Sequence, residues 1–133
     1  MITAELYRSI LYMPGSNERA LEKAKGLKCD GLIFDLEDAV GPDQKEYARS
    51  LVKNFMISQR AHYGSKKIII RVNGWDTIWG RDDFYFASEV HPDGILLPKI
   101  NSGKDFKQYL DLLKTPLNPK IKIWAMIETP SSI

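Results

Sequence analysis

The chain has 133 residues, of which 44% are hydrophobic and 27% are charged, proportions typical of one folded domain and not of a disordered segment. Its 19 basic and 17 acidic residues leave a net charge of +2, which is too balanced to predict a nucleic-acid partner. A single cysteine, Cys29, excludes an internal disulfide, and the lack of both an apolar run of about 20 residues and a secretory signal predicts a cytoplasmic protein with no membrane partner.

Five apolar segments predict β-strands. They are expected at 8–15, 31–40, 67–74, 94–100 and 122–129. The first is stopped by the Pro-Gly pair at its end. The continuous apolar run of the second is typical of a strand that is covered on both faces.

Helices are predicted between these strands. Ser16 is expected to cap a helix that runs to about Lys25. The segment 43–60 is predicted to be helical because apolar residues recur at helical spacing: Tyr47, Leu51 and Phe55, with Ala48, Val52 and Met56 beside them. A short helix is expected near 81–89, and another after Ser102, where an acid three residues later resembles a capping box.

Regular alternation of strand and helix predicts a parallel sheet of right-handed βαβ units. An open doubly wound sheet and a (β/α) barrel both satisfy this pattern. A dinucleotide-binding sheet needs a glycine-rich turn after its first strand, whereas the turn MPGSNER holds one glycine. Ionisable residues at several strand ends are typical of barrel enzymes. We therefore predict an α/β fold of the (β/α)8 TIM-barrel class, present as a partial barrel of about five βα units.

A complete barrel has eight units in about 250 residues, so five strands form only part of one. We expect residues 1–133 to be the N-terminal part of a single barrel domain, from a longer protein or a truncated product. A half-barrel exposes open sheet edges, which predicts self-association and a homo-oligomer. A compact open sheet of five strands is the alternative.

Side chains alternate along a strand, so charged residues near each strand end can be assigned to a face. The groups that share a face are Asp35 with Glu37; Ile69 with Arg71 and Asn73; Leu97 with Lys99; and Met126 with Glu128. Burying a bare charge is costly, so charges repeated at one end of an apolar sheet usually line a site where a ligand compensates them. This pattern predicts an active site at the carboxyl ends of the strands.

Each of these charges has two interpretations. The acids of DLEDAV suit a divalent cation, or else Asp38 caps a helix and Asp35 is held by a neighbouring base. Arg71 suits a substrate carboxylate or an oxyanion, or else it forms a structural ion pair with Asp35 or Glu37. Glu128 is either a Mg²⁺ ligand or a buried structural acid.

Basic residues follow the first strand and end the fourth. Arg19 and Lys23 lie four residues apart near a helix N-terminus, an arrangement that suits phosphates but is equally typical of a solvated helix surface. Lys99 is a candidate Schiff-base lysine, although pairing with a nearby charge is favoured. Trp75 and Trp79 form either a ligand-site wall or the cover of a helix end.

Five motifs in this order resemble the N-terminal half of the citrate lyase β-subunit-like family, which includes malyl-CoA lyases, in the HpcH/HpaI aldolase superfamily. They are RSILYMPGSNERALEKA, DGLIFDLEDAV, IIIRVNGWDTIWGRDD, DGILLPKI and IWAMIET, and they span nearly the whole chain. The resemblance implies a Mg²⁺-dependent (β/α)8 carbon–carbon lyase that acts on an acyl-CoA of the citryl-CoA or malyl-CoA type. The partners would be that acyl-CoA and a small carboxylic acid.

The resemblance also implies roles for individual residues. Tyr12, Arg19 and Lys23 would bind CoA and substrate at the mouth. Arg71 would hold the substrate and stabilise the enolate oxygen during aldol cleavage or condensation. Binding of the CoA moiety would position the acyl group.

For the metal, the resemblance implies Glu128 as one of two carboxylate ligands, the other lying beyond Ile133. Glu37 and Asp38 would orient metal-bound waters. Because one carboxylate makes a poor Mg²⁺ site, we expect little lyase activity from the 133 residues alone. Two alternatives are a noncatalytic subunit that binds CoA or a partner, and an aldolase of the superfamily that acts on free 2-oxo acids.

Overall fold

Five parallel strands lie side by side in the order in which they occur in the chain. The computed structural model describes residues 9–98 and 122–125. The strands are β1 (Ile10–Pro14), β2 (Gly31–Asp35), β3 (Lys67–Arg71), β4 (Gly94–Leu97) and β5 (Lys122–Ala125). The order β1-β2-β3-β4-β5 never reverses, as in a barrel wall and unlike a doubly wound sheet with a switch point.

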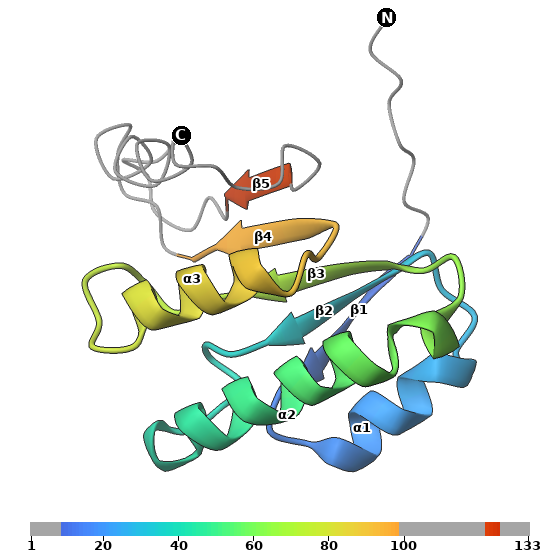
Figure 1. Cartoon of the computed structure of the whole chain (residues 1–133), viewed down its shortest axis with the longest axis horizontal. Coiled ribbons are helices and arrows are strands. Elements are labelled where there is room, and N and C mark those ends of the chain that lie inside the picture. Colours follow the sequence, from blue (N-terminus) through green and yellow to red (C-terminus); the bar gives the residue numbers. More distant parts are fainter. Residues whose placement is uncertain (1–8, 99–121, 126–133) are drawn as a thin grey trace, which may run out of the picture.

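The connections between the strands are helical. Helix α1 (Glu18–Lys23) runs into the 3₁₀ turn η1 (Ala24–Gly26), and α2 (Lys45–Ser58) lies between the 3₁₀ turns η2 (Pro42–Gln44) and η3 (Arg60–Tyr63). Helix α3 (Gly80–Glu89) joins β3 to β4. All three α-helices lie on the same face of the sheet (Figure 1).

The two faces of the sheet therefore differ. Alternate residues of β2 and β3 point outward into a large apolar core shared with the helices, in which Leu32, Phe34, Ile68 and Ile70 are fully buried. The residues between them point to the inner face. There Ile33, Ile69 and Leu96 form a second, smaller apolar cluster with Ile10 packed against it. This alternation puts the next residues along, Asp35 and Arg71, on the inner face as well.

The predicted strands are confirmed, and the first four end earlier than expected. The strand predicted at 31–40 ends at Asp35, because this carboxylate accepts hydrogen bonds from the backbone N–H groups of Glu37 (2.8 Å) and Ala39 (3.0 Å). Those amides consequently pair with a side chain and not with a neighbouring strand. The strands predicted at 67–74 and 94–100 end at residues 71 and 97. Of the strand predicted at 122–129, the structure describes Lys122–Ala125, which is β5.

One detail of the predicted helices was wrong. Asn17, not Ser16, caps α1: its Oδ1 accepts a hydrogen bond from the Ala20 amide at 3.0 Å. In α2, Tyr47 is 47% exposed. The buried stripe of that helix consists of Lys45, Ala48, Val52, Phe55 and Met56.

The short helix expected near 81–89 is confirmed as α3. The helix expected after Ser102 lies outside the described residues. Among the helices that are described, none is long and apolar enough to cross a membrane.

Candidate functional site

A buried ion pair joins β2 and β3 where both strands end. Asp35 and Arg71 are register partners, and the guanidinium donates to the carboxylate through Nε (2.7 Å to Oδ1) and Nη2 (2.5 Å to Oδ2). The two side chains are only 0% and 8% exposed. The hydrogen bonds to Asp35 are the largest cause that raises the pKa of Arg71 above its ordinary value, so the guanidinium is always charged.

Both carboxylate oxygens of Asp35 are occupied by hydrogen bonds within the protein. They accept from Arg71 and from the amides of Glu37 and Ala39. A carboxylate that accepts four hydrogen bonds has no lone pair directed at a metal. The predicted ion pair of Arg71 with Asp35 is therefore confirmed. It occupies Nε and Nη2 of the guanidinium, and the oxygens of Asp35 are not available to a cation.

Arg71 also faces a second acid. Its Nη1 lies 3.7 Å from Oε1 of Glu37, whose side chain is 9% exposed, so the guanidinium stands between two carboxylates. The predicted proximity of Arg71 and Glu37 is confirmed. Asp38, the next residue, is exposed to solvent.

Tyr12 covers the same guanidinium. The Cζ atom of Arg71 lies 4.9 Å from the centre of the Tyr12 ring, a cation–π contact across β1, β2 and β3. Tyr12 is nevertheless 48% exposed. The inner face at the carboxyl end thus carries an accessible aromatic ring next to a permanently charged arginine and a nearly buried glutamate.

A second polar layer lies behind this one, and the sequence analysis missed it. Lys45, at the first position of α2, is buried and donates to the backbone carbonyls of Leu36 (3.0 Å) and Glu37 (2.6 Å). Its ammonium also lies 5.3 Å from the centre of the Trp79 ring. Burial lowers the pKa of Lys45, even though several nearby carboxylates act in the opposite direction.

Asn73 and Asp83 complete this layer. The Asn73 amide group donates to the Leu36 carbonyl (2.8 Å) and to Asp83, and Asp83 also accepts from the Asn73 backbone and from Arg49 of α2 (2.7 Å). Asn73 therefore contacts helix α3. The expectation that it shares the inner face with Arg71 was wrong, because β3 has already ended.

The spacing of apolar residues contained a signal for Lys45. Lys45, Ala48 and Val52 follow one another at i, i+3 and i+7, which puts the lysine on the buried stripe of the predicted helix. A lysine at a core position must be hydrogen-bonded. No comparable signal in the sequence indicated the Arg49–Asp83 pair, which joins α2 to α3.

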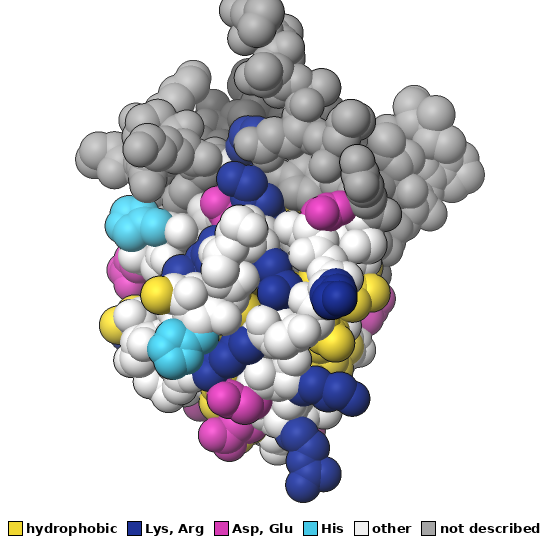
Figure 2. All heavy atoms as spheres, turned by 90° about the vertical axis from the view of Figure 1, so that its right-hand side faces the viewer, with side chains coloured by type: hydrophobic (Ala, Val, Ile, Leu, Met, Phe, Trp, Pro, Cys, Tyr) yellow, Lys and Arg dark blue, Asp and Glu magenta, His cyan; other side chains and the backbone are white. Residues whose placement is uncertain are grey.

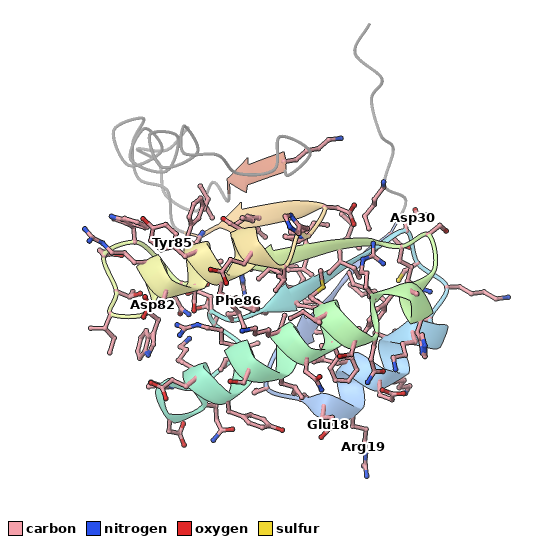
Figure 3. The ribbon with its side chains drawn as sticks, in the orientation of Figure 1. Glu18, Arg19, Asp30, Asp82, Tyr85 and Phe86 are labelled. Atoms are coloured by element: carbon pink, nitrogen blue, oxygen red, sulfur yellow. The ribbon has the colours of Figure 1, made fainter. Side chains whose placement is uncertain are left out.

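Arg19 and Lys23 lie apart from this site. Both are exposed, and together with Glu18 and Glu22 they border an open hollow on α1. Figure 3 shows Glu18 and Arg19 projecting from α1 away from the sheet. Arg71, in contrast, is on the inner face, so the two basic residues of α1 occupy a different layer of the molecule.

Other predicted positions lie outside the described residues, namely Lys99 and Glu128. The described residues contain no cluster of three or more His, Cys, Asp or Glu side chains able to hold a metal ion. Trp75 packs edge-on against Phe84 at 6.3 Å, which agrees with its role as the cover of a helix end.

Residues 8–133 match the protein family described as HpcH/HpaI aldolase/citrate lyase. The chain belongs to this family. The (3S)-malyl-CoA thioesterase of Cereibacter sphaeroides (strain ATCC 17025 / ATH 2.4.3) is 48% identical over 126 residues, which cover 95% of this chain and 42% of that protein. Citrate lyase subunit beta of Escherichia coli (strain K12) is 34% identical over 98 residues, or 74% of this chain and 32% of that protein.

The chain thus spans less than half the length of these family members. Among solved structures, the citrate lyase beta subunit of M. tuberculosis, complexed with oxaloacetate and magnesium, superimposes with a TM-score of 0.67 at 22% identity. The match covers 92% of this chain and 48% of that one. With the unreversed strand order and the separate inner cluster, this likeness confirms a parallel α/β fold of the barrel type.

Proposed function

We propose that this chain forms the N-terminal wall of a barrel enzyme that acts on a CoA ester of a small hydroxy acid by carbon–carbon bond cleavage or formation. The observation that carries the proposal is the charge arrangement on the inner face. A permanently charged Arg71 stands between Asp35 and Glu37 beneath the accessible ring of Tyr12. Membership of a family that includes citrate lyase subunits supports the same reaction class.

Arg71 is the proposed catalytic residue. Asp35 holds its Nε and Nη2 atoms, which fixes the plane of the guanidinium. A planar cation held in this way is preorganised for a substrate carboxylate or for the oxyanion of an enolate, and it needs no rearrangement when charge develops. Tyr12 is the proposed wall of the substrate site, because it is half exposed and its ring lies beside that cation.

Metal binding is proposed through Glu128 and a carboxylate that lies outside these 133 residues. Asp35 cannot contribute, since its oxygens already accept four hydrogen bonds. Glu37 and Asp38 are the proposed partners of metal-bound waters. A Mg²⁺ ion held there would supply a Lewis acid for the reacting oxygen.

Hydrolysis of the thioester is the second candidate, because the 48%-identical relative is a (3S)-malyl-CoA thioesterase. Malyl-CoA separates the two reactions by their products. Cleavage of the bond between the hydroxyl-bearing carbon and the CH₂ carbon next to the thioester gives acetyl-CoA and glyoxylate. Hydrolysis of the thioester gives malate and free CoA thiol. Chromatography of the CoA products, with and without Mg²⁺, is the deciding assay.

This assay uses the 133-residue chain and, where the coding sequence continues in frame, the longer product. The longer product is expected to give acetyl-CoA with glyoxylate and the 133 residues alone little turnover. This activity should disappear in Arg71→Lys, which keeps the charge but loses the fork. Free thiol with malate would replace the first candidate by the second. Binding of malyl-CoA without turnover in any form would favour a noncatalytic CoA-binding subunit.

Arg19 and Lys23 are the proposed contacts to the CoA phosphates. Replacing both with alanine should weaken malyl-CoA binding about tenfold, the scale of a hydrogen bond to a charged group. The matched control is the exposed Lys53 of α2. If the double variant binds as tightly as the Lys53→Ala control, α1 does not bind CoA, and an aldolase that acts on free 2-oxo acids becomes the better hypothesis.

A further inference from the structure

The short segment that carries Glu37 is held by buried side chains from three directions. Asp35 accepts the Glu37 amide at 2.8 Å. Lys45 donates to the backbone carbonyls of Leu36 (3.0 Å) and Glu37 (2.6 Å), which belong to the peptide groups on either side of the Glu37 α-carbon. Asn73 donates to the Leu36 carbonyl as well, at 2.8 Å. The peptide units before and after the Glu37 side chain therefore have fixed orientations.

The Lys45 ammonium has a cost that a purely apolar residue would not have. It is 7% exposed, and burial of an ammonium group is unfavourable unless hydrogen bonds compensate it. It donates to two backbone carbonyls of this one segment. These two hydrogen bonds explain why a lysine occupies this buried position.

Asn73 is itself fixed by a chain of contacts. Asp83 of α3 accepts from both the backbone and the side chain of Asn73, and Arg49 of α2 donates to Asp83 through Nε (3.0 Å) and Nη2 (2.7 Å). Asp83 is only 1% exposed. Two helices on the outer face of the sheet are thus linked by hydrogen bonds to the segment that carries an inner-face acid.

We propose that Lys45 and Asn73 are positioning residues, which fix the Leu36 and Glu37 carbonyls so that the Glu37 carboxylate stays beside Arg71. Neither touches the proposed substrate. They act through the backbone, since a rotated peptide at Leu36 or Glu37 would carry the carboxylate away from the guanidinium that it faces at 3.7 Å. The effect on substrate binding rests on the proposed function of the Arg71 site.

The test compares Lys45→Met, which keeps most of the side-chain volume and removes the ammonium, with Lys53→Met on the exposed side of the same helix. Hydrogen exchange by NMR should show the Glu37 and Ala39 amides of Lys45→Met exchanging about tenfold faster, the scale of one hydrogen bond to a charged group. Oxaloacetate with Mg²⁺ should bind about tenfold more weakly. Lys53→Met should change neither quantity.

Chemical rescue separates positioning from general stability. In a Cys29→Ala background, Lys45→Cys can be aminoethylated, which restores an ammonium on a side chain of the same length. Slow exchange and oxaloacetate affinity should both return. A uniform rise of exchange at all amides, or no rescue, would overturn the proposal.

Two further measurements cover the remaining outcomes. If Lys45→Met does not fold, the ¹⁵N signal of the Lys45 ammonium in the unchanged protein decides: proton exchange as fast as that of Lys53 would contradict the hydrogen bonds. If no form binds oxaloacetate, glyoxylate or malyl-CoA, the proposed function fails, while the exchange of the Glu37 and Ala39 amides still tests the positioning role.

Discussion

The two ends of the sheet differ in how deeply their ion pairs are buried. At the carboxyl end, the Arg71–Asp35 pair has side chains that are 8% and 0% exposed. At the amino end, Arg60 pairs with Asp93 at 3.1 Å, with side chains 32% and 33% exposed. Figure 2, which views the side of the molecule where the strands begin, shows lysine and arginine side chains in contact with solvent and interspersed with acids.

Charged side chains at the amino end accept hydrogen bonds from backbone amides at the starts of the strands. Asp93 accepts from the Ile68 amide at 2.8 Å and from Arg60, which also donates to the Lys66 carbonyl. Asp30 accepts the Ser9 amide at the start of β1. These are surface contacts that tie loops to strand ends. In barrel proteins, that end contributes to stability and the carboxyl end to function, and the burial of Arg71, Asp35 and Glu37 follows that division.

The largest expected difference between the two ends is the cost of breaking the ion pair. Asp35→Ala leaves a buried guanidinium without its main partner and should lower the free energy of unfolding by about 3–5 kcal/mol. Arg60→Ala, at the exposed pair, should cost about 1 kcal/mol or less. Urea unfolding of both variants measures this, and equal losses would show that burial does not distinguish the two ends.

Two glycines allow a second comparison of the two ends of the sheet: Gly80, after β3, and Gly26, before β2. A Cβ on Gly80, the first residue of α3, would lie 2.0 Å from the Gly74 carbonyl oxygen, whereas one on Gly26 would meet nothing within 4 Å. Gly80→Ala should destabilise by about 1–3 kcal/mol, the usual cost of overpacking. Gly26→Ala should be neutral or stabilising by up to about 1 kcal/mol. Thermal unfolding of the two variants compares them, and an unaffected Gly80→Ala would contradict the close approach of residues 74 and 80.

The smallest effect concerns one hydrogen bond at the amino end. Tyr63 is buried, and its hydroxyl donates to the Leu21 carbonyl at 2.7 Å. Tyr63→Phe should cost about 1 kcal/mol. Burial raises the pKa of Tyr63 above its ordinary value of 10.0.

The unfolded chain therefore ionises first as the pH rises, so this contribution is complete below pH 10 and is lost above it. The stability difference between wild type and Tyr63→Phe should shrink from pH 9 to pH 11. A difference that stays constant over this range would mean that the hydroxyl is not buried.

The sequence predicted most of the fold because each strand is a short apolar run, and alternation assigned Asp35, Glu37 and Arg71 to one face. It did not predict where β2 ends, since that depends on Asp35 accepting hydrogen bonds from two later amides. The sequence did not predict the buried position of Lys45, because a charged side chain is normally expected to be exposed to solvent. Ser16 and Asn17 are both good capping residues, and only the backbone geometry decides between them.

Paramagnetic relaxation by Mn²⁺ in place of Mg²⁺, measured on the arginine Nε–H signals, tests the central claim directly. Arg71 and Arg60 each bond an aspartate, but they lie at opposite ends of the sheet. If the carboxyl end binds metal and substrate, Mn²⁺ with oxaloacetate should broaden the Arg71 signal and leave that of Arg60 sharp. Broadening of both signals to the same extent, or of Arg60 alone, would contradict the account.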